Sequence, residues 1–102
     1  MNLEWTKPAL VDLENIWDFI KRDSEYYASQ FIEKIIDAVE SLKTFPEMGR
    51  NVPETESENI RELLFNNYRI IYQIETERVL ILTIIHAARN LSQAGSKPWE
   101  II

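Results

Sequence analysis

The sequence predicts an α+β domain in which a small antiparallel sheet carries a helical hairpin on one face. Three observations lead to this class: a short alternating segment at the start, two helical stripes before residue 46, and three strand-like segments after residue 59. The order strand, helix, helix, three strands is typical of helices packed on one side of an antiparallel sheet. With 102 residues, of which 45% are hydrophobic, residues 1–102 are expected to form one domain with one core.

The first helix is expected to follow a short opening strand. Leu3 and Trp5 alternate with polar neighbours, which predicts the strand. Thr6 can cap the helix, and Pro8 falls in its first turn, where a missing N–H does no harm. The apolar residues that follow fall on one helical stripe: Ala9, Leu13, Ile16, Trp17 and Ile20.

The second helix is expected to begin near Glu25, after cap candidates in residues 21–24. It should stop by Phe45, because Pro46 disfavours helical geometry in the residue before it. Together the two helices predict an antiparallel hairpin. The residues expected to face inward from the second helix are Ala28, Phe31, Ile32, Ile35, Val39 and Leu42.

Three strands are expected in the second half of the chain, after a loop at 46–59. They span 60–65, 68–75 and 78–86, and Asn66-Asn67 forms a two-residue turn between the first two. Residues 79–85 are almost wholly apolar, which predicts a central strand covered on one face by the helices. The core is expected to include Leu13, Ile16, Phe31, Ile35, Val39, Ile70, Tyr72, Ile81 and Ile84.

The last residues, Trp99-Glu100-Ile101-Ile102, end the chain on apolar side chains. Such residues at a terminus favour docking on the parent fold, and a patch that awaits a partner is the alternative.

Composition excludes several classes of protein. Zero cysteines exclude disulfides and thiolate metal sites, and a single histidine without paired carboxylates argues against zinc, so we expect no metal and no cofactor. No apolar run approaches the ~18 residues of a membrane span, and the start lacks the order of a signal peptide, which predicts a cytoplasmic protein without membrane contact. A sequence pI near 4.8 argues against a general nucleic-acid coating protein.

Charge is divided unevenly along the chain. Residues 1–60 contain 13 Asp and Glu against 6 Lys and Arg, whereas residues 61–102 contain 4 against 5. The predicted strands and the residues just after them carry four of the chain's strongest hydrogen-bond donors: Arg61, Arg69, Arg89 and the single histidine, His86. A group of cations on one sheet is a candidate site for an anion or a partner.

Five motifs occur in order along nearly the whole chain. They are Trp5-Thr6-x-x-Ala9-x-x-Asp12-Leu13, Phe45-Pro46-x-x-Gly49-Arg50, Arg61-Glu62-Leu63, Tyr68-Arg69-Ile70-x-Tyr72 and His86-x-x-Arg89. This pattern resembles the RelE/ParE superfamily, the toxins of type II toxin–antitoxin modules. It looks closer to the ParE-like plasmid stabilisation branch. The resemblance implies the fold described above, growth inhibition through protein–protein interaction, and a cognate antitoxin that wraps the toxin.

The resemblance implies three functions, which the residues leave open. ParE-like relatives poison DNA gyrase, RelE-like relatives cut messenger RNA on the ribosome, and a relative that only binds its antitoxin is the third case. Under the first, Arg61, Arg69 and Arg89 are the candidate target-binding residues. His86 and Arg69 are candidate catalytic residues only if the chain is a nuclease, because RNA cleavage needs proton transfer and positive charge over phosphorus. No lysine lies between 44 and 96, so whether the chain is an enzyme stays open.

Structural roles are also expected for these residues. Arg69 can form a cross-strand ion pair with Glu62, and the sequence supports this role and that of a target anchor equally. A plain edge-strand charge is favoured for Arg61, and a buried structural histidine is favoured for His86. Arg89 can bond strand ends or bind an anion beside His86, and Arg50 is expected to fix the loop through backbone carbonyls.

Overall fold

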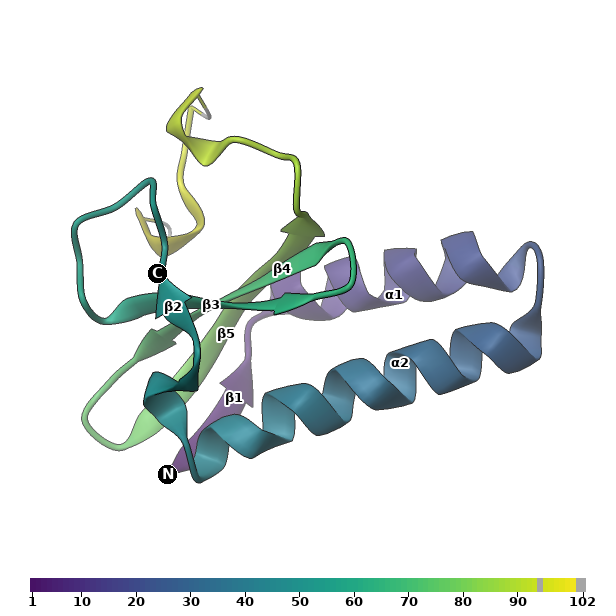
Figure 1. Cartoon of the computed structure of the whole chain (residues 1–102), viewed down its shortest axis with the longest axis horizontal. Helices are drawn as coiled ribbons and strands as arrows, with labels where there is room; N and C mark the ends of the chain where they lie inside the picture. Colours follow the sequence, from purple (N-terminus) through teal and green to yellow (C-terminus); the bar gives the residue numbers. More distant parts are fainter. Residues whose placement is uncertain (94, 101–102) are drawn as a thin grey trace.

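The computed structural model describes residues 1–93 and 95–100, and it confirms the α+β class (Figure 1). The two helices are α1 (Lys7–Lys21) and α2 (Glu25–Glu40). The strands are β1 (Asn2–Trp5), β2 (Arg50–Asn51), β3 (Ile60–Phe65), β4 (Tyr68–Ile74) and β5 (Arg78–His86). Short 3₁₀ turns are η1 (Ser41–Lys43), η2 (Pro46–Met48), η3 (Leu91–Gln93) and η4 (Pro98–Glu100).

The five strands form one sheet in the order β1-β5-β4-β3-β2. The chain reverses at each turn from β2 to β5, so these strands are antiparallel. In contrast to the prediction, β1 runs parallel to β5, paired from Asn2↔Arg78 to Trp5↔Ile81. Parallel neighbours need a long crossover, and the helical hairpin with the strands after it supplies one. The predicted loop also contains the two-residue strand β2, because Arg50 and Asn51 pair with β3.

The element boundaries follow the caps that the sequence offers. The Thr6 hydroxyl accepts a hydrogen bond from the Ala9 N–H at 3.2 Å, and the Ser24 hydroxyl accepts one from the Tyr27 N–H at 3.1 Å. The α-helical part of α2 ends at Glu40 and continues as the 3₁₀ turn η1, so the helix is shorter than predicted. Strands β3 and β5 match the prediction, β4 ends one residue earlier, and Asn66 takes a φ of 51° in the turn.

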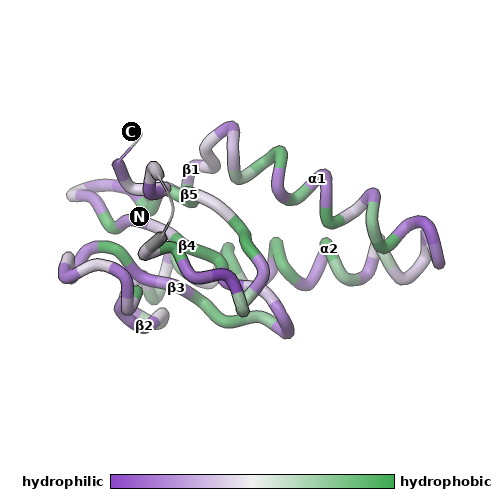
Figure 2. Tube along the Cα trace, turned by 90° about the horizontal axis from the view of Figure 1, so that it is seen from above, coloured by the Kyte–Doolittle hydropathy of each residue, from purple (hydrophilic) through white to green (hydrophobic). Residues whose placement is uncertain are grey.

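The sheet is covered on both faces. The hairpin packs on one face over the first core cluster, in which the predicted residues are buried apart from Leu13, which is partly buried. The tube in Figure 2 shows polar and apolar stretches alternating along both helices, as expected of helices half-exposed to solvent. The other face carries a second apolar cluster: Val52, Ile60, Ile71, Leu80, Leu82, Ile85 and Leu91.

The loop at 52–59 and the C-terminal segment contribute to the second cluster. Val52 and Leu91 are almost fully buried, and Trp99 packs against the cluster. The expected docking of the C-terminal segment is therefore confirmed for Trp99, whereas Ile101 and Ile102 lie outside the described residues. The sequence predicted cover on one face only, because this second cover is made by short, irregular segments without helical or strand periodicity.

Helix α1 completes the edge of β5 where β1 ends. The Thr6 N–H donates to the carbonyl of Ile81 at 3.0 Å, and the Thr6 hydroxyl donates to the carbonyl of Leu82 at 3.0 Å. A carboxylate oxygen of Asp12 accepts the Ile84 N–H at 3.0 Å and the hydroxyl of Thr83. The Thr6 and Asp12 positions of the first motif thus satisfy backbone groups that would otherwise form an open strand edge.

Gly49 closes a tight contact between the loop and the sheet. Its N–H donates to the Tyr72 hydroxyl at 2.9 Å, and that hydroxyl donates to the Pro46 carbonyl at 2.7 Å. Burial raises the pKa of Tyr72, so the hydroxyl keeps its proton and can donate. A Cβ at position 49 would lie 2.5 Å from this hydroxyl and 2.6 Å from the Glu62 carbonyl oxygen.

We expect Gly49→Ala to lower the free energy of unfolding by roughly 1–3 kcal/mol, because the added methyl group has no space. Urea denaturation followed by circular dichroism measures this difference. Gly95→Ala is the matched control, since a Cβ there meets nothing within 4 Å and the change should stay within about 0.5 kcal/mol. Equal stability of the Gly49 variant and the parent would contradict the described contact.

Candidate functional site

The strongest polar feature of the sheet is the buried side chain of Arg69, which is 6% exposed. Its Nε donates to Glu62 at 2.7 Å, and its Nη1 and Nη2 donate to the two carboxylate oxygens of Glu54 at 2.9 and 2.7 Å. Nη1 also donates to the carbonyl oxygen of Arg89 at 2.8 Å. The planar guanidinium therefore forms a fork onto Glu54 and uses every one of its nitrogens.

The arginine network, which we define as Arg50, Glu54, Glu62 and Arg69, follows from the register of the strands. Arg50 pairs with Glu62 across β2 and β3, and its Nε donates to the Glu62 carboxylate at 2.6 Å. Glu62 thus lies between two guanidinium groups. Glu54 comes from the loop after β2 and also accepts the Leu91 N–H at 2.9 Å. Four charges of alternating sign connect three strands, the loop and the C-terminal segment.

Each charge in the network supports the ionised form of its neighbour. Hydrogen bonds from Arg69 lower the pKa of Glu54 from its ordinary value of 4.5 to about 2 against the opposing effect of burial. Glu54 in turn raises the pKa of Arg69. The Glu54 carboxylate and the Arg69 guanidinium are therefore both charged at neutral pH. The small stabilisation that is typical of an exposed cross-strand ion pair does not apply to Arg69 and Glu62, since both side chains are buried.

A shallow hollow of about 420 Å³ opens to solvent above this network. We call it the arginine hollow, lined by Arg50, Pro53, Glu54, Arg69, Ala87, Arg89, Asn90 and Ser92. Three arginines line this hollow, and the network contains two carboxylates, those of Glu54 and Glu62. The local charge is therefore +1 in a chain whose net charge is −6. The Arg50 side chain is 58% exposed, and Arg89 is exposed. The hollow can therefore offer guanidinium donors to an anionic group.

The other two predicted site residues lie on the opposite face of the sheet. Arg61 is paired with Tyr72 and His86 with Tyr68, and both tyrosines belong to the face under the hairpin. Neighbouring residues of a strand point to opposite faces, so Arg69 faces away from them. The structure brings together Arg69 and Arg89 at one hollow, and it places the Arg69 side chain on the opposite face of the sheet from Arg61 and His86.

Arg61 and His86 are positioned by local contacts. The Arg61 Nη1 donates to the carbonyl of Gly49 at 2.9 Å and more weakly to that of Glu47 at 3.4 Å. Arg61 thereby fixes the loop, a role that the sequence assigned to Arg50. The prediction of a buried His86 was wrong, because the residue ends β5 and is exposed. Its ring lies edge-on to Tyr68 with centroids 6.1 Å apart, and its Nδ1 accepts the Ala88 N–H at 3.3 Å.

Sequence reasoning missed two contributors to the site. Glu54 stands in a run of acidic loop residues that resembled a solvated surface, and nothing local distinguishes it from Glu56 or Glu58. Arg50 was expected to bond backbone carbonyls and instead pairs with Glu62. The only signal available was the excess of acidic residues in the loop opposite a strand arginine, which does not specify a pair.

The described residues limit other kinds of site. Within residues 1–93 and 95–100, no group of three or more Asp, Glu and His side chains is arranged to hold a metal ion. No helix in this part of the chain is both long and apolar enough to cross a membrane.

The fold and this arrangement of motifs define a toxin of the RelE/ParE superfamily. The family model described as the ParE toxin of the type II toxin–antitoxin system parDE matches residues 3–91, and the chain belongs to this family.

Curated relatives agree with that assignment, and solved structures agree with the fold. The chain is 37% identical to "Toxin RelE2" of Caulobacter vibrioides over 86 residues, which cover 83% of this chain and 93% of that protein. It is 32% identical to "Putative toxin Y4kP" of Sinorhizobium fredii over 89% and 93% of the two chains. The fold is similar to a chain of the chromosomal ParDE system of P. aeruginosa, with a TM-score of 0.71, 24% identity and coverage of 84% and 95%. It is also similar to a chain of the RelBE2 toxin–antitoxin complex of Mycobacterium tuberculosis, with a TM-score of 0.62, 19% identity and coverage of 83% and 95%.

We expect stability to depend on the ionisation of Glu54 in acid. Its pKa is lower in the folded chain than its ordinary value, so its charge stabilises the fold above about pH 4.5, and this contribution is lost as the pH falls toward about 2. At about 1.4 kcal/mol per pKa unit, the full loss is on the order of 3–4 kcal/mol. Urea midpoints of the parent and Glu54→Gln between pH 7 and pH 2.5 should converge in acid. Glu58→Gln, at an exposed loop position, is the control. A constant difference across this range would contradict the ion pair.

We expect Arg69→Ala to destabilise the fold by roughly 3–5 kcal/mol, because it leaves the largely buried Glu54 carboxylate without its ion-pair partner and the buried Glu62 carboxylate with Arg50 alone. Thermal and urea denaturation measure the change. Arg78→Ala removes an arginine of the same sheet whose ion pairs among the described residues are with the partly exposed Glu4 and Glu75, so about 0–1 kcal/mol should be lost. If the two variants lose the same stability, the network does not hold the second face of the sheet.

Proposed function

We propose that this toxin inhibits DNA gyrase by protein–protein contact, with the arginine hollow as its contact surface. The ParE family model supports this function, because gyrase is the target that the ParE-like pattern implies. The observation that carries the proposal is the distribution of positive charge over the two faces of the sheet. Arg50 and Arg89 present exposed guanidinium groups on a rigid surface, which suits recognition of acidic side chains on a protein.

The same geometry argues against a nuclease centred on Arg69 and His86. A phosphate clamp needs free guanidinium donors, and every nitrogen of Arg69 already donates to an acceptor of the fold. His86 faces the opposite side of the sheet, and within the described residues its imidazole takes part in one hydrogen bond, in which Nδ1 accepts the Ala88 N–H. Acid–base catalysis requires the proton acceptor and the charge stabiliser to converge on one reacting group. These two residues do not converge.

An mRNA endonuclease is the second candidate function. The exposed ring of His86 favours it, because an accessible imidazole is the side chain that general acid–base catalysis uses most often. A relative that only binds its antitoxin is the remaining alternative.

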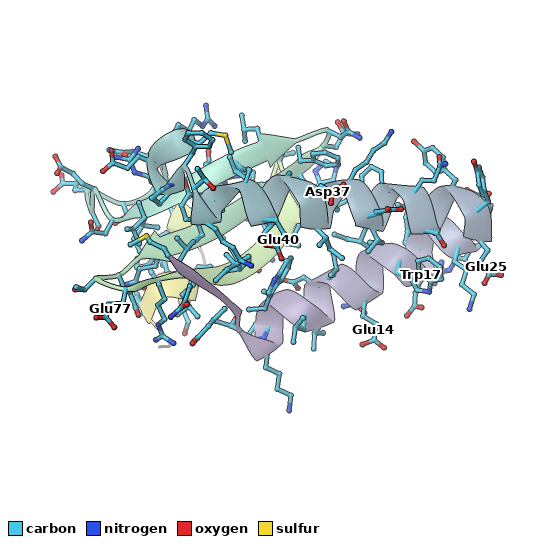
Figure 3. The ribbon with its side chains drawn as sticks, turned by 90° about the horizontal axis from the view of Figure 1, so that it is seen from below. Glu14, Trp17, Glu25, Asp37, Glu40 and Glu77 are labelled. Carbon is cyan, nitrogen blue, oxygen red and sulfur yellow. The ribbon has the colours of Figure 1, made fainter. Side chains whose placement is uncertain are left out.

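We further propose that a cognate antitoxin neutralises the chain by covering the helical hairpin. The structural neighbours come from toxin–antitoxin systems. The hairpin projects past the end of the sheet and exposes large apolar side chains: Leu10, Val11, Phe19, Tyr26, Tyr27 and Ile36. Exposed acidic residues lie on the same two helices, among them Glu14, Glu25, Asp37 and Glu40, which Figure 3 labels. Apolar surface rimmed by charge is typical of a partner-binding face.

One assay in cells and two with the purified protein test these functions. The chain is expressed from a repressed promoter, and growth is recorded on induction with and without the product of the adjacent reading frame. Purified protein is then added to a gyrase supercoiling assay and to a cell-free translation reaction. Growth arrest that the adjacent product relieves, with stalled supercoiling and intact messages, is the expected result. Cut messages with normal supercoiling would support the nuclease, and no effect in any assay would support the antitoxin-binding relative.

We expect Arg89→Ala to raise the concentration needed for half-maximal gyrase inhibition by about tenfold or more, since a charge-assisted hydrogen bond contributes about 1.5–3 kcal/mol. Arg50→Ala should act in the same direction. Arg78→Ala removes the same charge at the other end of β5 and should leave inhibition unchanged. His86→Ala should also leave it unchanged. Circular dichroism confirms folding of each variant. Full inhibition by a folded Arg50→Ala, Arg89→Ala double variant would remove the hollow from the proposal.

A further inference from the structure

A second, apolar hollow adjoins the arginine hollow. Its volume is about 370 Å³, and it lies between the start of α1, the end of β5 and the C-terminal segment. Polar groups at its edge come from Thr6, Thr83 and Ser96. The hydroxyls of Thr6 and Thr83 are already bonded to the fold, which leaves a mainly apolar interior. The side chains that form this interior are Pro8, Leu82, Ile85, Leu91 and Pro98.

Arg89 lines both hollows and therefore stands between them. Its backbone is fixed from two sides: the carbonyl accepts from Arg69 at 2.8 Å, and the N–H donates to the His86 carbonyl at 3.0 Å. Its side chain is exposed, and no carboxylate of residues 1–93 and 95–100 forms an ion pair with it. A rigid backbone thus presents an available guanidinium at the boundary between an apolar and a cationic surface.

The arginine hollow has one more guanidinium group than its network has carboxylates. Glu62 pairs with Arg50 and Arg69, and Glu54 also pairs with Arg69, which leaves Arg89 as the arginine of the hollow that has no carboxylate partner among residues 1–93 and 95–100. An anion placed beside Arg89 would extend the alternating order of the network. The Nη groups of Arg50 remain available to the same anion, because Arg50 bonds Glu62 through Nε.

We propose that the two hollows together bind a linear segment of a protein partner in which an acidic residue stands close to a large apolar residue. The carboxylate bridges Arg89 and Arg50, and the apolar side chain fills the hollow over Leu82 and Ile85. The proposal rests on the proposed function, in that it specifies the chemistry of the segment recognised at that surface. Nucleic acid fits less well, because half of the surface is apolar and the chain as a whole is negative.

A random 12-residue peptide library displayed on phage is the probe. It is panned on the immobilised full chain, with Arg89→Ala as the parallel selection. The parent should enrich peptides that contain Asp or Glu within a few residues of Leu, Ile, Phe or Trp, and the variant should not. Enrichment of peptides without an acidic residue, or the same peptides from both selections, would overturn the proposal.

Fluorescence anisotropy with one enriched peptide then assigns each half of the surface. Arg89→Ala should weaken binding by about tenfold or more, as should replacement of the peptide's acidic residue by its amide. Ser96→Trp places an indole at an exposed position of the apolar hollow and should weaken binding without touching the arginines. Arg78→Ala is the charge-matched control and should bind as the parent does. If Ser96→Trp and Arg89→Ala both bind like the parent, the surface is not the binding site.

Two comparisons distinguish failure of the peptide proposal from failure of the gyrase proposal. A fluorescein-labelled oligouridylate of 12 nucleotides should bind more weakly than the peptide. Tighter binding that depends on Arg89 would assign the hollow to phosphate and overturn the proposal. The anisotropy assay contains no gyrase, so peptide binding with undisturbed supercoiling would reject gyrase as the target and retain the binding segment. Stalled supercoiling with no enrichment of an acidic–apolar peptide would retain gyrase as the target and reject the proposed binding segment.

Discussion

The buried guanidinium of Arg69 is the interaction on which one whole face of the sheet depends. It joins β4 to β3 through Glu62, to the loop through Glu54, and to the C-terminal segment through the carbonyl of Arg89. The loop and the tail contribute few apolar side chains to this face, chiefly Val52 and Leu91. An unpaired buried charge would be strongly destabilising, so the geometry of the cover is set by the need to satisfy each member of the network.

This arrangement divides the positive charge of the sheet into two kinds. Arg69 and Arg61 are used by the fold, the first by two carboxylates and the second by the carbonyl of Gly49. Arg50 and Arg89 reach solvent and remain able to meet an anion. An arginine in a strand of a toxin is therefore weak evidence for a target contact until its own acceptors are known. The exposed pair at the hollow is a better candidate, because binding does not require the fold to give up a hydrogen bond.

Several family motifs have a structural explanation in this chain. Thr6 and Asp12 satisfy the edge of β5 beyond β1, and Gly49 leaves room for the Tyr72 hydroxyl. Arg69 with Glu62 forms the centre of the second face. In this chain these motif residues specify how the domain closes.

Sequence alone determined the elements of this protein, whereas tertiary structure decided which charged residues meet. The helical stripes, the cap at Thr6 and the strands at 60–65 and 78–86 follow from periodicity and local chemistry, which act over a few residues. The parallel pairing of β1 with β5 and the capture of Glu54 by Arg69 join segments far apart in the chain. Local patterns cannot specify such pairs, because every glutamate of the acidic loop has similar neighbours in the sequence. Only the folded chain places one of them, Glu54, beside Arg69.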